Sequence, residues 1–140
     1  AQCPWCIKEA GVAIGSTSNN TLDKGTALTS DSGVAIGKNA NASKENNNIA
    51  IGDDTNANGA YNIVIGKNAV AGGDGRGNEK RVGQSVAIGG GNKAWEGAKA
   101  FGDQSIALGA NTFAYGNSSI AIGNDDVDRA VAATTTYYKR

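Results

Sequence analysis

The 140-residue chain has no histidine, no methionine and one proline, and its Leu, Ile, Val and Phe residues number only 24, about 17% of the total. The absence of histidine excludes histidine-based triads and zinc catalysis. Thirteen basic residues balance thirteen acidic ones, so charge gives no reason to expect binding to nucleic acid or an anionic membrane. No run of 18 apolar residues exists that would span a bilayer. The length fits one domain.

So few large apolar residues are typical of disorder, but disorder usually comes with a high net charge, which this chain lacks. An internal repeat provides the order instead. One tetrapeptide recurs seven times. It consists of a branched residue, a middle residue that is usually alanine, a second branched residue and a glycine, and it occupies 12–15, 34–37, 49–52, 63–66, 86–89, 106–109 and 120–123. The glycines are 22, 15, 14, 23, 20 and 14 residues apart, which indicates a unit of about 14 residues with three insertions.

Each unit also carries a pair of small residues separated by one position. The second member stands five residues after the glycine at Ala42, Ala57, Ala71 and Ala114, and Ala98 and Ala100 fit if an insertion precedes them. Alternation with period two, and turn residues between the segments, predict two strands per unit. Fourteen residues are too few for a crossover helix, so we expect an all-β fold of stacked two-stranded coils, roughly 29 Å long at 4.8 Å per coil.

The alternation also predicts which residues face inward. We expect the branched residues of the first strand and the small pair of the second strand to form a thin interior. The middle alanines would then lie on the outer face, as a smooth stripe that packs against copies of the same chain. This stripe comprises Ala13, Ala35, Ala50, Ala87, Ala107 and Ala121. A homo-oligomer is therefore expected.

The repeat resembles the YadA-like head of trimeric autotransporter adhesins. The tetrapeptide with Ala-x-Ala between copies runs from about Gly11 to Asn124, and residues 105–123 match the family pattern almost position for position. The resemblance implies a left-handed parallel β-roll, a homotrimer, virulence-related display on the bacterial surface, and outer-membrane anchoring through a C-terminal region outside these residues. It also implies binding to a host collagen-, fibronectin- or laminin-like protein, or to an immunoglobulin-like receptor such as a carcinoembryonic-antigen-related adhesion molecule.

The two ends depart from the repeat. Residues 1–10 form a leader whose Cys3 and Cys6 have the spacing of a thioredoxin-like redox site, but no β-α-β pattern flanks them. A structural disulfide, within one chain or between chains, is the favoured interpretation. Metal binding is the alternative, although two cysteines supply only half of the ligands of a zinc site. Residues 11–124 form the head, and residues 125–140 are expected to connect it to a neck or stalk. No cofactor is expected.

The three insertions leave the roll at different edges. Those at 16–26 and 90–97 precede the second strand of their unit and are expected at one edge. The insertion at 73–84 follows a second strand and is expected at the opposite edge, where Arg76, Lys80 and Arg81 are secondary binding candidates. They are equally consistent with surface excursions that bind nothing.

The second strands of the last units carry aromatic residues where other units have Asn, Ser or Gly. Lys99 and Phe101, then Phe113 and Tyr115, occupy these outer positions, and Trp95 lies in the preceding insertion. We expect Phe101 beside Tyr115, and the group to form a ligand-binding patch. Packing of these rings under the insertion or against a neighbouring subunit is the alternative.

Two functions share this fold. An adhesive module is expected to show local departures from the repeat, whereas a spacer that projects other domains is expected to be uniform. The insertions and the aromatic residues favour adhesion. An enzyme is not expected, because the hexapeptide acyltransferases that also repeat Ile-Gly have a period of six and rely on histidine.

Overall fold

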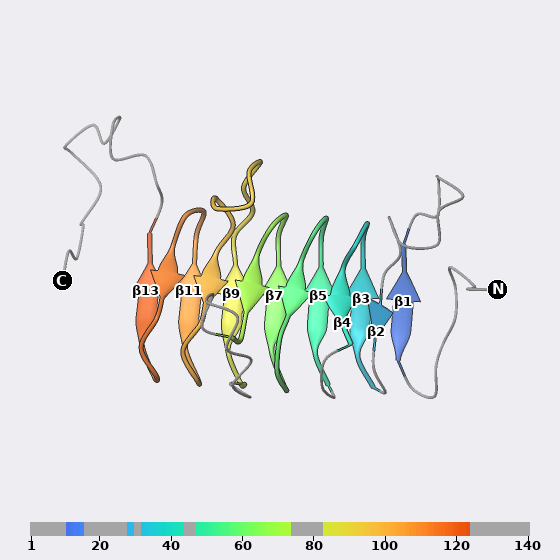
Figure 1. Cartoon of the computed structure of the whole chain (residues 1–140), viewed down its shortest axis with the longest axis horizontal. Helices are drawn as coiled ribbons and strands as arrows, with labels where there is room; N and C mark the ends of the chain where they lie inside the picture. The colour runs from blue at the N-terminus through green and yellow to red at the C-terminus, as the bar shows by residue number, and fades with distance from the viewer. Residues whose placement is uncertain (1–10, 16–27, 30–31, 44–46, 74–82, 124–140) are drawn as a thin grey trace.

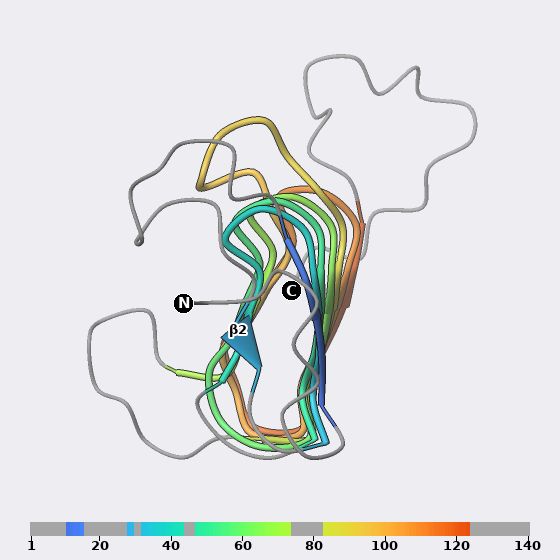
Figure 2. The same cartoon turned by 90° about the vertical axis from the view of Figure 1, so that its right-hand side faces the viewer.

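The computed structural model describes residues 11–15, 28–29, 32–43, 47–73 and 83–123, and within these ranges every regular element is a β-strand. The coils lie side by side along one axis, from β1 to β13 (Figure 1). Viewed along that axis, they superpose into a narrow loop with two long sides (Figure 2). The predicted all-β roll of stacked two-stranded coils is confirmed.

The repeated tetrapeptides build the first long side, a parallel sheet of seven three-residue strands. Neighbouring strands pair in register, as Ala35 does with Ala50. Equal repeat positions therefore form continuous rows along the roll. The strands are β1 (Val12–Ile14), β3 (Val34–Ile36), β5 (Ile49–Ile51), β7 (Ile63–Ile65), β9 (Val86–Ile88), β11 (Ile106–Leu108) and β13 (Ile120–Ile122).

The second long side is a parallel sheet of six two-residue strands. All but β2 end on the alanine predicted to occupy the second small position. The strands are β2 (Leu28–Thr29), β4 (Asn41–Ala42), β6 (Asn56–Ala57), β8 (Val70–Ala71), β10 (Lys99–Ala100) and β12 (Phe113–Ala114).

The direction of the first-strand side chains is opposite to the prediction. The middle residues Ala35, Ala50, Val64, Ala87 and Ala107 are fully buried inside the roll. The branched residues on either side of them remain partly or largely exposed on the outer face. The two sheets are too close together for large side chains on both inner faces, so the alanines pack inward. The expected outward alanine stripe is therefore wrong.

The small pairs of the second strand do face inward, as predicted. Ala40 with Ala42, Ala69 with Ala71, and Ala98 with Ala100 are fully buried, and they meet the first-strand alanines across the interior. The core thus consists almost entirely of small side chains. Such a core buries little apolar surface per residue, because the stabilisation is roughly proportional to the area removed from water.

A row of buried polar side chains lines the corner that precedes β5, β7, β9 and β11. Asn48 accepts a hydrogen bond from the Asn62 backbone N–H at 2.9 Å, and Asn62 accepts one from the Ser85 N–H at 3.0 Å. The Ser85 hydroxyl in turn donates to the Gly102 carbonyl at 2.8 Å. These bonds join successive coils and satisfy polar groups that burial would otherwise make costly.

The chain turns sharply at both edges of the roll through left-handed backbone conformations. At the edge that follows the tetrapeptide, the residue with positive φ is Asn39, Asp54, Asn68 or Asn111, and asparagine and aspartate tolerate this conformation. At the other edge it is Ser32, Asn47, Tyr61, Gln84, Gln104 or Ser118. Tyr61, at φ 61°, is a bulky residue in a conformation that costs energy for most side chains.

The tetrapeptide glycines allow the coils to stack closely. Gly37 has φ 128°, and a Cβ there would lie 2.7 Å from the Gly52 carbonyl oxygen in the next coil. A larger residue would both strain the backbone and push the coils apart. The glycine of the motif is therefore a requirement of stacking.

Of the three insertions, the described residues include the one at 90–97. It follows β9 and precedes β10, at the edge where the other tetrapeptides turn into their second strands. Residues 1–10 with Cys3 and Cys6, most of the other two insertions, and residues 125–140 lie outside the described residues. Over the described ranges, no helix is long and apolar enough to cross a membrane.

Candidate functional site

The outer side of the six-stranded sheet changes character along the roll. Asn41 and Asn56 occupy the early strands, Val70 follows on β8, and Lys99 and Phe113 occupy the last two. These five positions are in register. Since parallel strands are about 4.8 Å apart, the amide end and the aromatic end are only a few strand widths apart.

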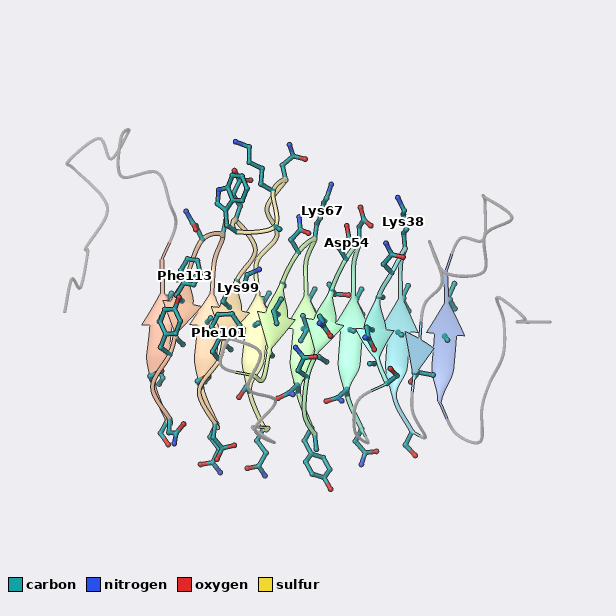
Figure 3. The ribbon with its side chains drawn as sticks, viewed as in Figure 1. Lys38, Asp54, Lys67, Lys99, Phe101 and Phe113 are labelled. Carbon is teal, nitrogen blue, oxygen red and sulfur yellow. The ribbon has the colours of Figure 1, made fainter. Side chains whose placement is uncertain are left out.

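Three rings lie together at the β12 end of this surface, and we call Phe101, Phe113 and Tyr115 the aromatic cluster. The ring centroids of Phe101 and Tyr115 are 5.5 Å apart, and those of Phe113 and Tyr115 are 5.8 Å apart with planes only 8° from parallel. Figure 3 shows Phe101 and Phe113 on neighbouring coils. Phe113 is 37% exposed and Tyr115 66% exposed, so water reaches the cluster.

Lys99 does not contribute an accessible charge to this surface. It stands in register between Val70 and Phe113, yet it is only 7% exposed, and its ammonium group donates a hydrogen bond to the Asn68 carbonyl oxygen. Burial lowers the pKa of its side chain below the ordinary 10.5. The expectation that Lys99 is available to a ligand is not supported by this placement.

Trp95 is presented by the 90–97 insertion and is 60% exposed. Its ring lies 5.1 Å from the Lys93 ammonium, a cation–π arrangement. The Glu96 carboxylate closes the turn by accepting hydrogen bonds from the backbone N–H groups of Asn92, at 2.8 Å, and Lys93, at 3.0 Å. The loop therefore has a defined shape.

Two further hydrogen bonds fix this loop to the coils on either side. The Asn68 side-chain amide donates to the Gly91 carbonyl at 3.0 Å, and the Asn111 backbone N–H donates to the Glu96 carbonyl at 2.6 Å. Asn111 belongs to the corner that leads into β12 and Phe113. Trp95 thus stands at the edge next to the aromatic cluster, with its ring paired to Lys93.

The opposite side of the roll carries a continuous apolar surface, which we call the aliphatic face. It consists of the first and third residues of all seven strands: Val12, Ile14, Val34, Ile36, Ile49, Ile51, Ile63, Ile65, Val86, Ile88, Ile106, Leu108, Ile120 and Ile122. Every one of them is partly or largely exposed. The alternation in the sequence did not predict this surface, because it placed these residues inside. The signal was present, since two branched residues per strand exceed what so thin a roll can hold.

Charged side chains gather at the corners instead of on the two faces. Lys38, Asp54 and Lys67 follow one edge (Figure 3). Lys67 pairs with Asp53 at 3.7 Å, an exposed pair of the kind that contributes at most about 1 kcal/mol. In the described part of the chain, no three His, Cys, Asp or Glu residues gather to hold a metal ion. Arg76, Lys80 and Arg81 lie outside the described residues.

The geometry defines a class: a parallel β-roll of short coils with one aliphatic outer face and one face that is polar and aromatic. The family model described as YadA head domain repeat (2 copies) matches residues 29–46, 96–112 and 100–125. No curated protein and no solved structure matches the chain. Over these residues the roll is similar to the YadA head domain repeat, a family of adhesin-type domains.

Proposed function

We propose that this chain is the head of a surface-displayed bacterial adhesin, a homotrimer that binds a host matrix or receptor protein through the aromatic cluster. The observation that carries the proposal is a group of three adjacent rings on the side of the roll away from the aliphatic face, in which Phe113 and Tyr115 are exposed and Phe101 is partly buried. Exposed aromatic groups are favoured contact residues because they bury a large area with little loss of conformational entropy.

Trimer formation is supported by the aliphatic face. Soluble monomers rarely expose contiguous apolar patches larger than a few hundred Å², and this face spans all seven strands without a charged side chain. Three such faces around a three-fold axis would cover one another, as the YadA-like resemblance implies. The corrected sidedness replaces the alanine stripe with these branched residues as the assembly surface.

The candidate host partners remain those that the resemblance implies: a collagen-, fibronectin- or laminin-like matrix protein, or an immunoglobulin-like receptor such as a carcinoembryonic-antigen-related adhesion molecule. Outer-membrane anchoring through a C-terminal region is part of the same proposal. A trimer carries three copies of the aromatic cluster, so weak single contacts would combine on a surface that presents repeated ligands.

A structural spacer is the second candidate. The coils from β3 to β8 support it, because their second-strand outer positions are Asn41, Asn56 and Val70 without any aromatic residue. If the chain is an adhesin, adhesion then depends on the last coils alone. The adhesin and the spacer therefore predict different results for a substitution confined to those last coils.

The test measures binding of the full chain to immobilised collagen, fibronectin, laminin and a receptor ectodomain. The double variant Phe113→Asn/Tyr115→Ser introduces residue types found in other coils and removes two rings of the cluster. We expect at least a tenfold loss of binding to whichever protein the parent binds. Tyr61→Asn is the matched control, because it removes a tyrosine that is 56% exposed at a corner outside the cluster. Full binding by a correctly folded double variant would exclude the cluster, and no binding by the parent would favour the spacer.

A further inference from the structure

We infer that the aromatic cluster recognises an uncharged oligosaccharide carried by the host glycoprotein. This inference rests on the proposed function and specifies the chemical group that the cluster contacts. Three properties of the surface support it: its small area, its lack of accessible charge, and its combination of ring faces with side-chain amides.

The exposed area of the cluster is too small for a protein interface of ordinary size. An aromatic side chain buries about 150–250 Å², so the exposed parts of these three rings amount to about 350 Å² at most. A stable protein–protein interface needs about 800 Å² on each partner. One or two sugar rings are the size of ligand that three partly exposed aromatic rings can cover.

Within the described residues, the outer positions of the strands that lead to the cluster carry no accessible charge, and the exposed Lys93 of the neighbouring 90–97 loop is paired with the Trp95 ring. The outer positions of β4, β6, β8, β10 and β12 are Asn41, Asn56, Val70, Lys99 and Phe113, and the one ionisable group among them is buried. A sulfated or sialylated glycan that lies along these strands would meet no accessible cation on them to pair with its charge. An acidic or basic peptide would likewise lack a complementary group. Charge therefore favours a neutral ligand.

Amide groups stand at a suitable distance from the rings. Asn58 follows β6, and its side-chain nitrogen lies 3.8 Å from where a Cβ on Gly73 would be, so it borders the glycine positions after β8. Two strand steps, or about 10 Å, separate β6 from β10, which corresponds to about two linked sugar rings. Gly72, at the intermediate position, adds no side chain that would block this path.

The rings supply the other half of the recognition. A pyranose presents C–H groups on one face, and these pack against the negative face of an aromatic ring. Phe113 and Tyr115 are stacked nearly parallel, so a flat ligand can pack against an outer ring face of the stack but not between the two rings. The Tyr115 hydroxyl and the Asn58 amide can then exchange hydrogen bonds with sugar hydroxyls. Single sites of this kind bind in about the millimolar range, and several sites on one assembly raise the apparent affinity about a hundredfold or more.

The first test uses saturation-transfer NMR on the full chain with a neutral tetrasaccharide of galactose and N-acetylglucosamine and its sialylated counterpart. We expect transfer from the protein's aromatic protons to the C–H protons of the neutral sugar, and weaker transfer to the sialylated one. The single variant Tyr115→Ser, at a 66% exposed side chain that contributes little to the core, should reduce the signal at least fivefold. Tyr61→Asn should leave it unchanged. No transfer to the neutral sugar, or equal transfer with Tyr115→Ser, would overturn the inference.

The second test separates this inference from the proposed function. Binding to intact fibronectin is compared with binding to fibronectin treated with glycosidases. A loss with treatment that matches the loss in Phe113→Asn/Tyr115→Ser supports a sugar ligand. Binding that survives treatment but is lost in the double variant overturns the sugar while leaving the cluster as a protein-binding site. Binding that survives both changes overturns both proposals for this cluster.

Discussion

The opposite directions of two neighbouring residues in β9 provide a sharp test of assembly. Ala87 is fully buried inside the roll, whereas Ile88 is 38% exposed on the aliphatic face. The variants Ala87→Leu and Ile88→Ser therefore act on different structures, although the changes are one position apart. We expect Ala87→Leu to destabilise the fold of each chain and Ile88→Ser to weaken association between chains.

The magnitudes follow from burial. Complete burial of an isoleucine side chain is worth about 1.5–3 kcal/mol, so covering the exposed 38% of Ile88 in the proposed trimer would contribute about 0.6–1.1 kcal/mol per chain, or about 2–3 kcal/mol per trimer. That corresponds to about a hundredfold change in the trimer dissociation constant. Overpacking at Ala87 costs about 1–3 kcal/mol of fold stability, because Val64 already occupies the neighbouring position in the ladder.

Sedimentation over a series of concentrations measures the association of each variant, and urea unfolding followed by circular dichroism measures the fold. We expect Ile88→Ser to shift the trimer–monomer midpoint to higher concentration, and Ala87→Leu to lower the urea midpoint without changing the stoichiometry of the folded chain. A folded parent monomer at micromolar concentration would refute the trimer. Dissociation by Ala87→Leu together with no effect of Ile88→Ser would refute the assignment of the assembly face.

Three further predictions concern stability and are checked by thermal or urea unfolding. Tyr61→Asn should stabilise the chain by about 1 kcal/mol, because Asn47 shows that asparagine fits this left-handed corner, and an unchanged midpoint would contradict the strain. The pKa of Lys99 is lower in the folded chain than in the unfolded chain, so the unfolded chain binds the proton more tightly. As the pH rises toward 10.5, the free energy of unfolding should therefore increase more in the parent than in Lys99→Met. Parallel pH profiles of the two proteins would contradict the burial of Lys99. Gly102→Ala should lower the free energy of unfolding by more than about 2 kcal/mol, because the added Cβ would overlap the Gly116 carbonyl. Gly116→Ala should change it by no more than about 0.5 kcal/mol, because the nearest atom to the added Cβ lies at 3.6 Å. Equal effects of the two variants would contradict the stacking geometry.

Local pattern accounts for the parts of the fold and site that the sequence predicted. Period-two alternation and glycine spacing locate the strands, and equal places in successive units put Phe101 beside Tyr115. Both relations are fixed by chain connectivity and the strand repeat. They hold whichever side of a strand faces inward.

The sequence alone determined the coil, its length and the rows of stacked residues, but the tertiary structure decided which row is inside. In the first strand both faces are apolar, so alternation separates alanine from the branched residues without orienting them. Only the distance between the two sheets admits Ala50 and excludes Ile51 from the interior. The burial of Lys99 has the same origin, because its partner, the Asn68 carbonyl, lies 31 residues earlier in the chain and becomes its neighbour only when the coils stack.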